Sequence, residues 1–129
     1  MTEMAINEAL QQAVGAYNAG ETEVAKRLFV KIIEINPKQP DANHNMGLLL
    51  VKSGDFEDAI PFFKTALEAN FSAAQYWFSY IDALLKLGRY TQVSELLAIA
   101  KSKGCKGKAF DDLQGELNST EVQLRIRIE

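Results

Sequence analysis

Residues 40–73 carry two apolar patterns at helical spacing, and this stretch restricts the fold of the chain more than any other. In the first pattern Met46, Gly47 and Leu50 recur at steps of three and four residues. The second pattern consists of Phe56, Ala59, Phe63, Ala66 and Leu67. Because only the short break at residues 53–55 separates them, the two helices must fold back on each other as an antiparallel hairpin. The small residues Gly47 and Ala59 then let the two backbones approach closely.

The same unit of 34 residues recurs on both sides of this hairpin. Gly20 and Gly88 stand at the places that correspond to Gly54, and Phe29 and Leu97 hold a large apolar position of the following helix. Three tandem units of one length with the same turn residue predict a helical repeat array. We therefore predict an all-α fold, an α-solenoid of antiparallel helix pairs in a single domain, with units at residues 6–39, 40–73 and 74–107.

The first unit is less regular than the other two. When it is aligned by Gly20, the apolar residues of its first helix lie one position late; they are Leu10, Ala13, Val14 and Tyr17. Two explanations stay open. Either the turn is one residue tighter, or this end helix is rotated by roughly 100°, which is one residue of helical turn. End units of a solenoid are often atypical because only one side is covered.

Two segments follow the third unit. Residues 108–118 predict a helix that covers this unit, with an apolar face formed by Phe110, Leu113 and Leu117. The apolar residues of segment 119–129 alternate as in a strand, but they are also spaced as in a helix. We favour the start of a further helix, capped by Thr120 with Gln123, because no other strand is present to pair with. Its apolar end, at Ile126 and Ile128, indicates either a truncated array or a surface that meets another molecule.

The three units resemble the tetratricopeptide repeat, a helix-turn-helix unit with large, glycine, alanine and aromatic residues at set positions. The matching residues are Met46, Gly47, Ala59, Phe63 and Ala66 in the second unit, and Trp77 and Gly88 in the third. The resemblance covers residues 6–107 and departs from the pattern at Asn43, Phe71, Ile81 and Cys105. It implies a right-handed superhelix in which the first helix of each unit lines a concave groove that binds other proteins.

By this resemblance, the groove positions predict the binding residues. They are Asp41, His44, Asn45 and Lys52 in the second unit, Phe78, Ser79, Asp82 and Lys86 in the third, and Gln11 in the first. Further groove positions are Asn7, Leu10, Val14 and Asn18 in the first unit, Leu48 in the second and Gln75 in the third. Asn45 is the sharpest candidate, because a side-chain amide both donates to and accepts from a peptide backbone. The alternative for this face is a solvated helix surface, and the alternative for Phe78 is packing against the adjacent unit. The lysines and arginines that clamp a terminal carboxylate in relatives are replaced here, so we do not expect chaperone C-terminal tails as ligands.

Composition excludes several other classes of function. A net charge of −3 argues against nucleic acid as the main partner, since phosphate neutralisation requires clustered lysine and arginine. The chain has one histidine and one cysteine, His44 and Cys105, which the repeat places apart, and it lacks metal-ligand clusters and nucleotide-binding motifs. We therefore predict no enzymatic activity, no cofactor and no metal. With no signal peptide and no apolar run that spans a membrane, we expect a cytoplasmic protein with no membrane partner.

The function predicted from the sequence is non-catalytic protein–protein interaction, with an extended peptide or a partner's helix bound in the concave groove. A second hypothesis is that the chain is part of a larger transferase with such repeats, in which it recruits the substrate protein. A third is self-assembly, as a homodimer formed through the apolar C-terminal segment.

Overall fold

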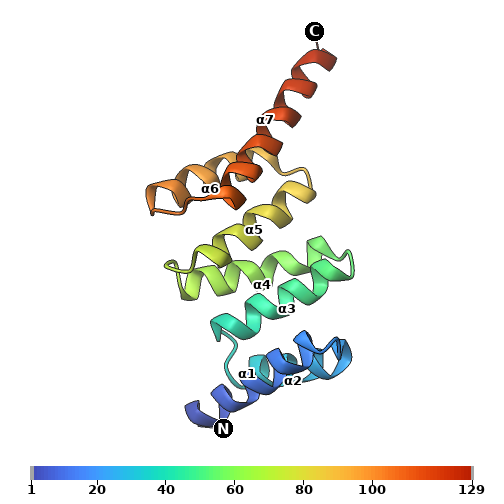
Figure 1. Ribbon diagram of the computed structural model, residues 1–129, viewed down its shortest axis with the longest axis vertical. Coiled ribbons are helices and arrows are strands. Elements are labelled where there is room, and N and C mark those ends of the chain that lie inside the picture. The colour runs from blue at the N-terminus through green and yellow to red at the C-terminus, as the bar shows by residue number, and fades with distance from the viewer. Residues whose placement is uncertain (1, 129) are drawn as a thin grey trace.

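The computed structural model describes the backbone of residues 2–128 and, beyond residue 121, the side chains of residues 123 and 124 only. This part of the chain is entirely helical apart from its connections, as predicted (Figure 1). The helices are α1 (Glu3–Asn18), α2 (Thr22–Ile35), α3 (Pro40–Lys52), α4 (Phe56–Ala69), α5 (Ala74–Lys86), α6 (Tyr90–Ser102) and α7 (Lys108–Ile128). They stack along one axis, with the N-terminus at one end and α7 at the other (Figure 1).

Three equivalent glycines form the turns inside the three helix pairs. Gly20, Gly54 and Gly88 have φ angles of 80°, 82° and 76°, a left-handed conformation that favours glycine. In each pair the first helix ends two residues before this glycine, and the second helix begins two residues after it. The turn after α1 thus has the same length as the other two, and the expectation of a tighter first turn is wrong.

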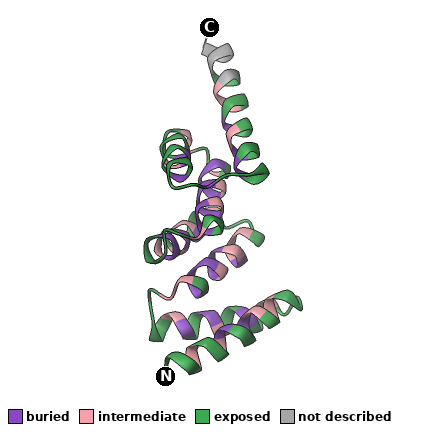
Figure 2. Ribbon diagram, turned by 60° about the vertical axis from the view of Figure 1, so that its left-hand side comes forward, coloured by how far each residue is buried: buried purple, intermediate pink, exposed green. Residues whose placement is uncertain are grey.

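Gly47 of α3 lies directly against the ring of Phe63 of α4. A Cβ atom at this position would lie 2.4 Å from Cε1 of Phe63, a distance that real structures do not contain. Phe63 itself is fully buried, so its ring has little freedom to withdraw. The prediction that a small residue here lets the two helices pack together is confirmed. Buried residues occur in every described helix along the stack (Figure 2).

The C-terminal part of the chain differs from the prediction of two separate segments. Residues 108–118 and the following residues to 128 belong to one helix of 21 residues, α7, so the predicted break near residue 119 is wrong. Thr120 does not cap a new helix; its Oγ1 donates a hydrogen bond to the Glu116 carbonyl within α7, at 2.9 Å. The first half of α7 covers α5 and α6 with three buried residues, Phe110, Leu113 and Leu117. The second half extends away from the stack (Figure 1), and the side chains of Ile126 and Ile128 lie outside the described residues.

Candidate functional site

The first helices of the pairs, together with α7, lie side by side along one side of the stack: α1 contacts α3, α3 contacts α5, and α5 contacts α7. We call this side the inner face. Between α1 and α3 the inner face holds a hollow of about 560 Å³, which we call the inner groove. Its lining residues are Leu10, Gln11, Val14, Gly15, Asn18, Asp41 and Asn45. The structure thus brings together three of the predicted site residues, Gln11, Asp41 and Asn45.

The register of α1 explains why the first unit contributes so much of this lining. Leu10, Gln11, Val14 and Asn18 all reach the inner groove, and these are the positions that the 34-residue spacing gives without any rotation. The alternative of a rotated end helix is therefore wrong. Leu10 and Val14 form an apolar floor, while the side-chain amides of Gln11, Asn18 and Asn45 surround it.

Asn45 is held in place by its own helix. Its Nδ2 donates a hydrogen bond to the backbone carbonyl of Asp41 at 2.8 Å, one turn earlier in α3. The amide oxygen of Asn45 has no hydrogen-bond partner among the described residues. The side chain is half-buried in the wall of the inner groove, so this oxygen is the group that it can offer to a ligand donor.

His44 and Ser79 do not present their side chains to solvent, contrary to the prediction that they line the groove. His44 is only 3% exposed, and its Nε2 lies 2.7 Å from Oγ of Ser79, which is also buried. The imidazole ring also packs against Tyr76, with 4.7 Å between ring centroids, and more loosely against Phe63. This buried polar pair joins α3 to α5 beneath the inner face and is not available to a ligand.

Burial controls the protonation of this cluster. It lowers the pKa of His44 to about 4, against the opposing effect of the nearby Asp41 carboxylate. Tyr76 donates a hydrogen bond from its hydroxyl to that carboxylate, and burial followed by this contact raises the pKa of the Tyr76 hydroxyl. Asp41 is thereby fixed at the edge of the inner groove. Sequence analysis did not identify Tyr76 as part of this site, because only the packing of α5 against α3 brings its hydroxyl to Asp41.

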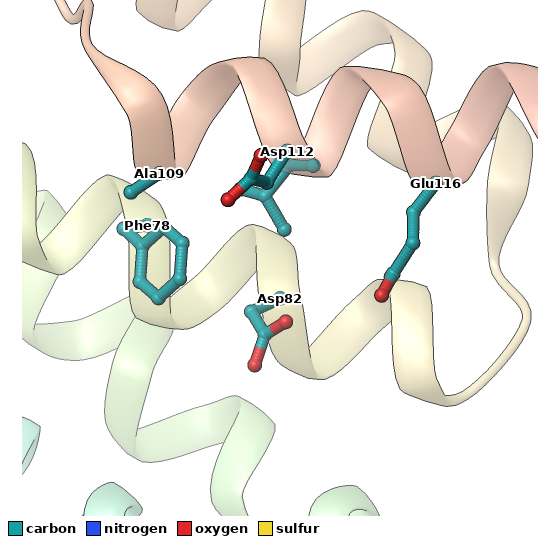
Figure 3. Close-up of a pocket in the computed structure, with 6 residues that line it drawn as sticks. Phe78, Asp82, Ala109, Asp112 and Glu116 are labelled. Carbon is teal, nitrogen blue, oxygen red and sulfur yellow. The ribbon is translucent and has the colours of Figure 1, made fainter.

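The remaining predicted residues lie apart from the inner groove. Phe78 and Asp82 line a smaller cleft of about 260 Å³ between α5 and α7, where three carboxylates gather, those of Asp82, Asp112 and Glu116 (Figure 3). Phe78 packs edge-on against Phe110 of α7, with 6.0 Å between ring centroids, as its packing alternative predicted.

The two predicted lysines are engaged by neighbouring side chains. Lys86 lies 3.2 Å from a carboxylate oxygen of Asp82 and 3.9 Å from one of Glu116. Lys52 stands over the ring of Tyr17, with Nζ 5.6 Å from the ring centroid. Neither lysine lines the inner groove.

The described residues contain neither a candidate metal-ligand group nor a helix that could span a membrane. Among them, no group of three or more histidine, cysteine, aspartate or glutamate side chains is placed to hold a metal ion. None of the described helices combines the length and the apolar character needed to cross a bilayer.

The sequence of residues 44–92 matches the family model of the tetratricopeptide repeat. The curated relatives include cellulose synthase operon protein C of Komagataeibacter xylinus, which is 29% identical over 90 residues. That match covers 70% of this chain but 7% of the relative. The chain therefore spans less than a tenth of the length of the curated relatives that it matches.

Solved structures with the same fold include two that hold peptides. The first tetratricopeptide-repeat domain of Spaghetti (RPAP3), bound to the Hsp90 peptide SRMEEVD, has a TM-score of 0.84 at 11% identity and covers 95% of this chain and 97% of its own. The Yersinia enterocolitica type III secretion chaperone SycD, in complex with a peptide of the translocator YopD, has a TM-score of 0.75 at 16% identity. The match covers 99% of this chain and 98% of the SycD chain.

An enzyme contains the same fold as one part of its chain. The O-GlcNAc transferase of Thermobaculum terrenum has a TM-score of 0.76 at 22% identity, and the match covers 91% of this chain and 23% of the transferase.

Proposed function

Because the chain is a tetratricopeptide-repeat protein, we propose that it is a non-catalytic interaction module that binds an extended peptide segment of a partner protein in the inner groove. The observation that carries this proposal is the composition of the groove: an apolar floor of Leu10 and Val14 with the amides of Gln11, Asn18 and Asn45 around it. The peptide-bound structures of Spaghetti and SycD support it, since both share this fold.

The chemistry of the groove suits the backbone of an extended peptide. Such a backbone presents alternating N–H and C=O groups, and each side-chain amide in the groove both donates and accepts. One bulky apolar side chain of the peptide fits against Leu10 and Val14, and burying it supplies affinity. Recognition then depends mainly on backbone groups and on one anchor position in the peptide.

The same groove does not suit an acidic peptide. Its lining includes the Asp41 carboxylate but neither lysine nor arginine, so a carboxylate-rich segment would meet a like charge and no partner. We therefore propose a partner segment that is neutral or basic. In this respect the chain differs from Spaghetti, whose bound peptide SRMEEVD carries three acidic side chains.

A displayed library of random peptides of about ten residues tests the proposal, with selection on the immobilised chain and calorimetric titration of the enriched peptides. Gln11→Ala and Asn45→Ala should each weaken binding about fivefold, the effect of losing one hydrogen bond. Gln12→Ala is the matched control, because Gln12 is exposed on the same helix but does not line the groove. Equal affinities of the Gln11 and Gln12 variants, or tight binding of SRMEEVD, would refute the proposal.

The two other functions predicted from the sequence stay predictions. Recruitment of a substrate protein within a larger transferase would appear as activity on that substrate in a longer chain, lost when groove residues are changed. Self-assembly would appear in light scattering as a molar mass that doubles with concentration.

A further inference from the structure

A second hollow is lined by residues of α4, α5 and α6 and of the connection between α4 and α5. It has a volume of about 490 Å³, and we call it the outer groove. Leu67, Trp77 and Tyr80 form its buried floor. It shares no lining residue with the inner groove. Its size lies within the range of pockets that hold ligands or a few side chains of a partner.

Two exposed apolar side chains stand at the rim of the outer groove. Phe71 is 51% exposed and Ile99 is 44% exposed, and both line the hollow. The backbone of Phe71 is held in place by Trp77, because the indole N–H donates a hydrogen bond to the Phe71 carbonyl at 2.8 Å. Single exposed apolar side chains are common, but two that converge on a hollow with an aromatic floor mark a binding surface.

The charge around the outer groove is positive. Lys64 and Lys103 line it, and Lys38 lines an adjoining hollow that shares Glu68 with it. Three lysines thus surround one glutamate, although the whole chain carries a net charge of −3. Within the described residues, none of these lysines has a carboxylate oxygen within 4.0 Å. The apolar hollow is therefore bordered by cations that have no anionic partner in the part of the chain that the structure describes.

We infer that the outer groove binds a short acidic and apolar segment of a partner protein. Bulky apolar side chains of the segment pack between Phe71 and Ile99 over Trp77, and its aspartate or glutamate side chains face Lys64 and Lys103. The charge selects the occupant, because a basic or neutral segment of equal hydrophobicity would leave both lysines without an anionic partner. Lys103 contacts the ring of Phe71, with Nζ 5.7 Å from the ring centroid, and Phe71 is itself part of the proposed surface. This surface is independent of the proposed inner-groove function, so a second partner segment can bind there while the first is occupied.

The test compares two displayed libraries of about twelve residues, which differ only in charge. Both contain randomised Leu, Ile, Phe and Met, with Asp and Glu between them in one library and Lys and Arg in the other. Enriched peptides are then titrated while the emission of Trp77 is recorded. Trp77 is the only tryptophan of the chain and lies 6.2 Å from the ring of Phe71, so its emission reports on this groove.

Surface substitutions locate the binding. Ile99→Ser should weaken binding of the acidic peptides at least tenfold, as should Lys64→Glu combined with Lys103→Glu. Ile35→Ser is the matched control, because Ile35 is equally exposed, at 44%, but lies on α2 away from the groove, and it should leave binding unchanged. Asn45→Ala should also leave it unchanged, which separates this surface from the inner groove.

Several results would overturn the inference. These are enrichment of the basic library above the acidic one, no enrichment from either, equal binding by the Ile99 and Ile35 variants, and an unchanged Trp77 emission at saturation. Analytical ultracentrifugation gives one more such result. If the unaltered chain is a dimer and the Ile99→Ser variant is a monomer, the occupant of the outer groove is a second copy of the chain.

Discussion

The single histidine of this chain should make its stability depend on pH in a range where few other side chains titrate. In the unfolded chain His44 gains a proton below about pH 6.5, whereas burial in the folded chain delays this to about pH 4. Between these values the unfolded state binds more protons than the folded state. The free energy of unfolding must therefore decrease as the pH falls from 7 towards 4.

The size of the effect follows from the two pKa values. At pH 5 this difference in the pKa of His44 raises the equilibrium constant for unfolding about 30-fold, relative to a chain in which the pKa is the same in both states. The factor corresponds to a loss of about 2 kcal/mol in the free energy of unfolding. At pH 7 the same factor is close to one. With a urea dependence of about 1–3 kcal/mol per molar, the midpoint should be lower at pH 5 than at pH 7 by roughly 1 M.

Urea unfolding followed by far-ultraviolet circular dichroism at pH 7, 6 and 5 measures this loss. His44→Gln should abolish most of the difference between pH 7 and pH 5, because no titrating ring is left at this position. His44→Phe, which keeps a ring beside Tyr76, serves the same purpose if the glutamine variant does not fold. If the unaltered chain and the variant lose equal stability between pH 7 and pH 5, the loss does not come from His44 and the reasoning is refuted.

Three further changes test the packing. Gly47→Ala should lower the free energy of unfolding by about 1–3 kcal/mol in thermal or urea unfolding, because the new methyl group clashes with Phe63; no change would mean that the ring moves freely. Asn43→Ala should cost a similar amount, about 1–3 kcal/mol, because the buried amide donates to two backbone carbonyls before α3, at 3.1 and 2.8 Å; Asn43→Asp, which lacks the donor, should behave like the alanine variant. Arg89→Ala should lower the free energy of unfolding by less than about 1 kcal/mol, because its ion pair with Glu57 is exposed. A larger loss would contradict this and show that the pair stabilises the fold.

The helix pairs were predictable because the information for them is local. Gly20, Gly54 and Gly88 mark the turns through a backbone conformation that belongs to each residue itself. The apolar spacing on either side of each glycine fixes a helix and its buried face without reference to the rest of the chain. The same spacing correctly placed Asn45 and Gln11 on the inner face.

Local sequence signals failed at the last helix. Thr120 with Gln123 forms a capping pattern, but α7 continues through it, and the Thr120 hydroxyl donates to the Glu116 carbonyl within the helix. A threonine hydroxyl can accept from a backbone N–H as a helix cap or donate to the carbonyl four residues earlier within a helix. The sequence around Thr120 permits both, so it does not decide between them.

The repeat, its turns and the positions that face inward follow from the amino-acid sequence alone. Which inward positions are accessible depends on the tertiary structure. His44 and Ser79 are buried, although at equivalent positions of other units Phe78 and Asn45 are half-buried and Gln11 is exposed. They are buried because α5 approaches α3 there, with Tyr76 packed on the imidazole and bonded to Asp41. The outer groove likewise arises where α4, α5 and α6 meet. Burial is a property of pairs of elements, and helical periodicity describes only one element at a time.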